Sequence, residues 1–70
     1  MVVVPASLIA FGDLRRRIVD TLSQFPDSGT KWRDGRRVLT IRRYTFAYRH
    51  YPAEAEVWVL DVFGPGMDWR

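Results

Sequence analysis

The chain has no cysteine, one histidine and one lysine among its 70 residues. Neither a disulfide nor a thiolate metal site can form, so a small domain of this sequence lacks the usual covalent and metal stabilisation. We predict no metal site and no cofactor. A long hydrophobic run is also missing, because residues 2–11 are mostly apolar but too few to cross a bilayer, and they include Pro5 without the basic residues of a secretory signal. We therefore expect a cytoplasmic protein with no membrane partner.

The length predicts one domain covering residues 1–70. A chain this short buries only about 60% of the surface that its unfolded form exposes, so its core is small. Hydrophobic residues make up 47% of the sequence, which is enough for a packed domain. A partner protein or a second copy of the chain would supply stability that the core lacks, and a homo-oligomer is one such arrangement.

The positive charge is carried almost entirely by arginine. Eleven Lys plus Arg stand against eight Asp plus Glu, for a net charge of +3. Arginine binds phosphate or carboxylate with a flat fork of donors and stacks on aromatic rings. A nucleic acid or an acidic protein would suit this charge, and an ordinary solvated surface would explain it equally well.

The apolar pattern predicts one helix followed by three strands. Apolar residues recur every three or four positions from Leu8 to Phe25, on one face of a helix that Pro26 ends. Gly12 lies within this helix, so two shorter helices are the alternative. Two glycines, two aspartates and a proline in residues 26–35 predict a loop.

Residues 36–51 alternate as strands do, with Leu39 and Ile41 in one phase and Tyr44, Phe46 and Tyr48 in the other. The change of phase predicts a turn at Arg42-Arg43, and a single bent strand is the alternative. Residues 57–63 form the last strand. These elements predict an α+β fold in which one amphipathic helix packs on a three-stranded antiparallel sheet.

The order of these elements resembles the RelE/ParE superfamily of type II toxin-antitoxin systems, in particular its ParE-like branch. The resemblance covers residues 7–69 and rests on a helix ending in Phe25-Pro26-x-x-Gly29, on Arg37-x-Leu39-x-Ile41-x-x-Tyr44-x-Phe46-x-Tyr48, and on a hydrophobic strand shortly before Asp68-Trp69. It implies a toxin that inhibits growth by binding its target, which is DNA gyrase in that branch. It also implies an antitoxin whose disordered segment neutralises the toxin.

The sequence departs from the family pattern in two places, before the helix and after the last strand. The chain lacks the usual first strand and helix, and Val2-Val3-Val4 is either a remnant of that strand or a segment that pairs with another chain. Gly64, Pro65, Gly66 and Met67 stand where family members carry a histidine and arginines. We therefore expect a protein that is not an enzyme. The alternatives are a RelE-like endoribonuclease acting on messenger RNA at the ribosome, and an inactive remnant or nucleic-acid-binding module.

The candidate site residues are mainly basic. For binding they are Lys31, Trp32, Arg33, Arg36, Arg37, Arg42, Arg43 and Arg49. For the ribonuclease alternative, Arg43, Arg49 and Tyr51 would supply cations and an acid. We expect Trp32 to be an exposed anchor and Trp58 and Trp69 to pack in the interior. We expect His50 to lie on the surface at a strand end, and the sheet face opposite the helix to stay cationic and open.

Overall fold

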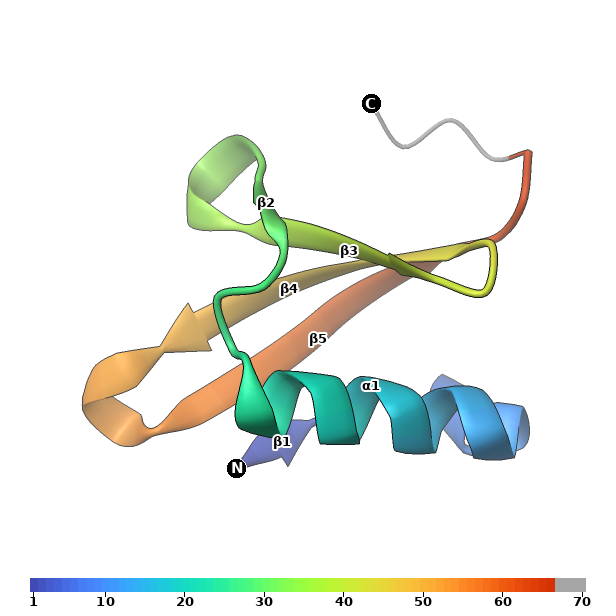
Figure 1. Cartoon of the computed structure of the whole chain (residues 1–70), viewed down its shortest axis with the longest axis horizontal. Helices are drawn as coiled ribbons and strands as arrows, with labels where there is room; N and C mark the ends of the chain where they lie inside the picture. The colour runs from blue at the N-terminus through green and yellow to red at the C-terminus, as the bar shows by residue number, and fades with distance from the viewer. Residues whose placement is uncertain (67–70) are drawn as a thin grey trace.

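The computed structural model describes residues 1–66, and for residues 7, 9 and 10 it describes the backbone only. One helix, α1 (Gly12–Gln24), lies against one face of a twisted sheet (Figure 1). The strands are β1 (Val2–Val3), β2 (Thr30–Lys31), β3 (Arg37–Ile41), β4 (Tyr44–Tyr51) and β5 (Glu56–Phe63). Short 3-10 helices cover Ala6–Phe11, Arg33–Gly35 and Pro52–Glu54. No helix within residues 1–66 is long and apolar enough to span a membrane.

The predicted α+β class is confirmed, but the sheet is larger than we predicted. It has five strands in the order β1-β5-β4-β3-β2. β1 runs parallel to β5, and the other neighbours are antiparallel. The prediction of three antiparallel strands missed β1 and β2 because each has only two residues, too few to show alternation. We expected the first strand to be lacking, with Val2-Val3-Val4 either a remnant of it or a segment that pairs with another chain. A short first strand is present, since Val2 and Val3 pair with Val57 and Trp58 of the same chain.

The predicted helix is divided into two pieces. A 3-10 helix covers Ala6–Phe11, and α1 begins at Gly12, which is where glycine was expected to weaken a continuous helix. Leu8, Leu14, Ile18 and Leu22 are buried as the periodicity predicts. Phe11 and Phe25, at the ends of the same pattern, are exposed. The apolar stripe is therefore shorter than the pattern indicates.

The core lies between α1 and the sheet. It joins the buried helix residues to Phe46 and Tyr48 of β4 and to Val57 and Val59 of β5. Tyr48 and Phe46 are among the largest fully buried side chains, which confirms their predicted place in the core, and Tyr44 packs against them while partly buried. The pairing of β4 with β5 has an irregularity, because Ala47 pairs with Asp61 but the next residue, Tyr48, pairs with Val59. The extra residue in β5 reverses the alternation, so that Val62 rather than Asp61 faces the core.

The predicted turn at Arg42-Arg43 is confirmed, and its backbone is unusual. Arg42 has φ 50° and Arg43 has φ 75°, so both residues of a two-residue hairpin turn are left-handed. Such turns strongly prefer Asn-Gly or Gly-Gly, because a side chain makes this conformation costly. Both arginines are exposed, and no packing contact of the core requires them. The hairpin therefore carries a cationic tip at a cost in stability.

Replacing Arg42 by Asn and Arg43 by Gly is expected to stabilise the protein. The gain in free energy of unfolding should be about 1–2 kcal/mol, because the new residues adopt positive φ more easily. Urea denaturation followed by circular dichroism measures it. The control is Arg42→Gln with Arg43→Gln, which removes the same two charges but keeps both Cβ atoms. An equal gain in the control would show that charge repulsion, not backbone strain, is relieved.

Candidate functional site

A tight turn after α1, formed by Asp27, Ser28 and Gly29 and called here the pinned turn, is fastened to the sheet. The backbone N–H of the buried Gly29 donates to the hydroxyl oxygen of Tyr48 over 2.8 Å. A Cβ on Gly29 would lie 2.6 Å from that oxygen and 2.8 Å from the carbonyl oxygen of Val38. Only glycine lets the backbone come this close. The aromatic core of the sheet thus fixes where the chain leaves the helix.

Two further side chains hold the pinned turn from its exposed side. Arg37 Nη1 donates to the carbonyl oxygen of Gly29 over 2.8 Å, and its Nε lies 3.5 Å from Asp27 Oδ1. The same carboxylate oxygen is 2.9 Å from Nδ1 of His50. We expected His50 on the surface at a strand end, but its side chain is only 19% exposed, and the fold brings Asp27 to it from 23 residues away. Arg37 therefore serves the turn and is not a free cation.

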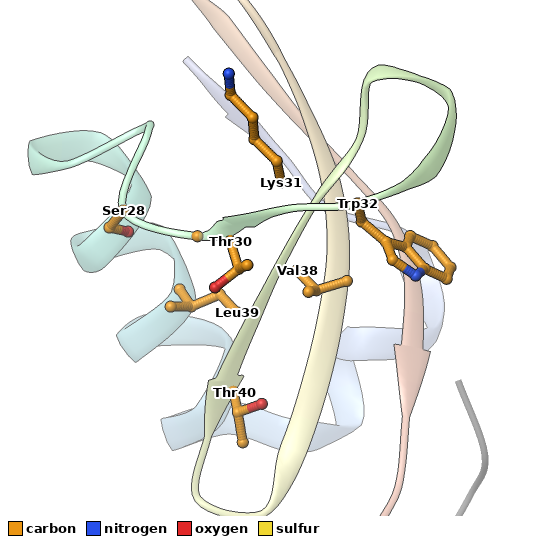
Figure 2. A pocket seen from close by; sticks show the side chains of 8 residues that line it. Ser28, Thr30, Lys31, Trp32, Val38, Leu39 and Thr40 are labelled. Atoms are coloured by element: carbon orange, nitrogen blue, oxygen red, sulfur yellow. The ribbon is translucent and has the colours of Figure 1, made fainter. Parts of the chain in front are cut away.

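A groove of about 420 Å³ lies beside the pinned turn at the edge of the sheet (Figure 2). Ser28 and Gly29 form one wall, Thr30, Lys31 and Trp32 follow along β2, and Val38, Leu39 and Thr40 of β3 form the floor. The lining mixes hydroxyl groups with aliphatic carbon. Figure 2 shows Lys31 extending away from the other side chains that line the groove.

The groove lies next to a strand edge that is only half paired. β2 pairs only with Arg37 and Val38 of β3. Within residues 1–66, the edge of β3 that faces β2 is therefore unpaired from Leu39 to Ile41. On the other side, β4 pairs with the whole of β3. A half-paired strand presents N–H and C=O groups that an extended peptide can bind as an added strand.

The structure does not gather the predicted basic residues into one patch. Arg33 lies over the indole ring of Trp32, with 4.6 Å from its guanidinium carbon to the ring centroid. Arg49 donates through Nη2 to the carbonyl oxygen of Asp34. Arg36 is partly buried, Lys31 is exposed on the short β2, and Arg42 with Arg43 lies at the distant hairpin tip. Most of these arginines hold local structure rather than a common ligand.

The prediction of an open cationic face opposite the helix was wrong for half of the sheet. Val38, Thr45 and Ala47 alternate with core residues and so face away from α1, yet all three are buried. The loop after β2 crosses this face, and Trp32 meets Phe63 there edge to face at 6.3 Å between ring centroids. Trp32 is accordingly half-buried and is not the exposed anchor that we expected.

The prediction for Trp58 was also wrong. Trp58 was expected in the interior but is 42% exposed, because it alternates with the buried Val57 and Val59 and faces away from the helix. Trp69, Asp68 and the end of the chain lie outside the described residues. Residues 57–63 are apolar on both faces apart from Asp61, so strand alternation alone did not show which face the helix covers.

The three catalytic candidates do not converge. Arg43 precedes β4, Arg49 lies within it and Tyr51 ends it. Arg43 and Tyr51 are thus separated by the full length of an eight-residue strand, which is about 26 Å. Arg49 is held by Asp34, and within residues 1–66 no cluster of His, Asp and Glu is placed to hold a metal ion. Sequence reasoning also missed Asp27 and the groove residues Ser28, Thr30 and Thr40, although the Pro26-Asp27-Ser28-Gly29 turn marked where the groove begins.

Comparisons with protein-family models, with curated proteins and with solved structures gave no match to this chain. The site is therefore interpreted from its own geometry.

Replacing Gly29 by alanine is expected to destabilise the fold and deform the groove. The added methyl group would press on the Tyr48 hydroxyl and on backbone, which should cost about 1–3 kcal/mol of unfolding free energy. Thermal and urea denaturation measure the loss. Gly12→Ala is the matched control, because a Cβ there meets no atom within 4 Å and alanine favours the helix. Wild-type stability of Gly29→Ala would show that the pinned turn is not held as described.

Proposed function

We propose that this protein is a toxin-like component of a type II toxin-antitoxin system, similar to the ParE-like branch of the RelE/ParE superfamily. It acts in the cytoplasm by binding a target, for which DNA gyrase is the family precedent. The element order supports the proposal, because a first strand and a short helical piece precede α1 and three longer antiparallel elements follow it. This is the pattern that the resemblance implies, with its first strand and helix shortened rather than missing.

The groove beside the half-paired edge of β3 is where we place the antitoxin. An extended segment lying there would extend the sheet through the edge of Leu39, Thr40 and Ile41 and would contact both the aliphatic and the hydroxyl groups of the lining. The exposed Lys31 beside the groove would attract the acidic residues expected of an antitoxin segment. A segment that is disordered when free suits such a site, because it can become extended and ordered as it binds along the strand edge.

Binding is favoured over RNA cleavage by one observation, the wide separation of Arg43 and Tyr51 along β4. Cleavage through a 2′-hydroxyl needs a base, an acid and a cation around a single phosphate. The ribonuclease alternative, with the ribosome and messenger RNA as partners, would require groups from another molecule to complete the site. A homo-oligomer stays a proposal of the same kind, resting on the small core and the unpaired strand edges.

Inducible expression of this protein in bacteria is expected to arrest growth. Co-expression of an acidic antitoxin, sought in the adjoining reading frame, should restore growth. Thr30→Trp, which fills the groove from an exposed position, should still arrest growth but should escape this rescue. Gln24→Trp, an equally exposed change on α1, should behave as wild type. Absence of any growth defect from soluble protein would overturn the toxin proposal, whereas rescue of Thr30→Trp would overturn only the position of the antitoxin.

Purified protein is expected to leave messenger RNA intact when ribosomes are present. The catalytic candidates do not surround one phosphate, so primer extension should detect no new 5′ ends. A variant with Arg43→Ala provides the matched comparison, since this exposed side chain is not needed by the core. Cleavage by the wild type that disappears in Arg43→Ala would contradict the proposal and establish the ribonuclease alternative.

A further inference from the structure

Two aromatic side chains stand exposed on the sheet face away from α1, beyond the part that Trp32 covers. Trp58 of β5 is 42% exposed and Tyr51 at the end of β4 is 37% exposed. Tyr51 pairs with Glu56 and Arg49 pairs with Trp58, so Tyr51 and Trp58 are diagonal neighbours on one face. Burying Trp58 would gain more than burying almost any other side chain of this small chain, yet the fold leaves it in contact with solvent.

A shallow cavity of about 320 Å³ lies between these rings and two carboxylates. Tyr51, Glu54, Glu56 and Trp58 line it, and we call it the Trp58 site. Trp58 Nε1 donates weakly to Glu56 Oε1 over 3.4 Å, which places a carboxylate beside the indole ring. Glu54 is exposed in the 3-10 helix that links β4 to β5.

No basic side chain of the described chain neutralises these carboxylates. Both salt bridges found within residues 1–66 use Asp27, so neither Glu54 nor Glu56 has a cation within 4.0 Å. Two cations lie nearby without pairing to these glutamates. The charged amino group of Met1 donates to the carbonyl oxygen of Ala55, and the guanidinium of Arg49, which pairs with Trp58 in the sheet, donates to that of Asp34. The Trp58 site is thus an acidic and aromatic surface on a protein whose net charge is +3.

We propose that the Trp58 site binds the guanidinium group of an arginine side chain from a partner protein. An aromatic face attracts a cation, and a carboxylate at its side accepts guanidinium hydrogen bonds. Guanidinium suits the site better than ammonium, since it is flat, weakly hydrated and stacks on indole. The chain already contains one such contact, in which Arg33 lies over Trp32.

This inference is independent of the toxin proposal, because it concerns a different surface. The Trp58 site carries negative charge, whereas the groove lies beside the positively charged Lys31. The two sites lie toward opposite edges of the sheet, since Trp58 pairs with the edge strand β1 and Lys31 lies on the other edge strand, β2. Antitoxin binding and arginine recognition can therefore be tested separately.

Titration of the ¹⁵N-labelled protein with N-acetyl-arginine amide tests the site. The indole N–H signal of Trp58, assigned by its loss in Trp58→Phe, should shift saturably, and that of Trp32 should stay in place because Arg33 already covers its ring. The citrulline analogue has nearly the same shape without the charge, and it should shift the Trp58 signal much less. Equal shifts with the two compounds would overturn the proposal in favour of plain apolar contact.

The carboxylates provide the second test. Glu54→Gln with Glu56→Gln is expected to weaken arginine binding roughly two- to fivefold per exposed charge removed. Asp13→Asn with Asp20→Asn removes the same charge from the exposed face of α1 and should leave the affinity unchanged. The amide spectrum reports whether each variant is folded. A folded wild type whose Trp58 signal does not move with arginine, or an equal weakening in both double variants, would overturn the proposal.

Discussion

The hydrogen bond from the Gly29 N–H to the Tyr48 hydroxyl connects the two layers of this protein at the point where the chain passes from one to the other. It is buried, so breaking it would leave a polar group without a partner, which typically costs about 1–3 kcal/mol. Because it fixes the turn after α1, it also fixes where β2 meets β3 and therefore where β2 stops pairing. The groove and the half-paired edge of β3 lie directly beside this contact. Arg37 and His50 hold the same turn through Asp27, and Arg37 also donates to the carbonyl oxygen of Gly29.

Several arginines stabilise loops in this small domain, whose hydrophobic core is small. Arg37 binds the pinned turn, Arg33 covers Trp32 and Arg49 holds the loop that crosses the sheet. The guanidinium groups of Arg37 and Arg49 donate to backbone carbonyl oxygens, and that of Arg33 stacks on an indole ring. Much of this charge therefore holds loops in place, whereas Lys31 on β2 and the arginines of the hairpin tip and of α1 stay exposed to solvent. The exposed Glu54 and the partly buried Glu56 beside Trp58 carry the opposite sign.

Several features were predictable from the sequence because they depend on local pattern. The buried positions Leu14, Ile18 and Leu22 follow from helical period, and Phe46 and Tyr48 from strand alternation. The turn at Arg42-Arg43 follows from the change of phase, although its residues are poor turn formers. The positions of Trp32 and Trp58 were not predictable in the same way, because one depends on a loop folding back over the sheet and the other on which of two apolar faces the helix covers.

The sequence by itself determined the α+β class, the approximate boundaries of the three longer strands and the residues of the main core, since periodicity and turn chemistry act over a few neighbouring residues. Only the tertiary structure decided that Val2 and Val3 join the sheet beside β5, that Asp27 meets His50, and that the basic residues are dispersed. These outcomes involve residues far apart in the chain, such as Val2 and Val57. Pairing between residues so far apart in the sequence depends on how the whole chain packs. A strand of two residues is also too short to show the alternation that would predict it.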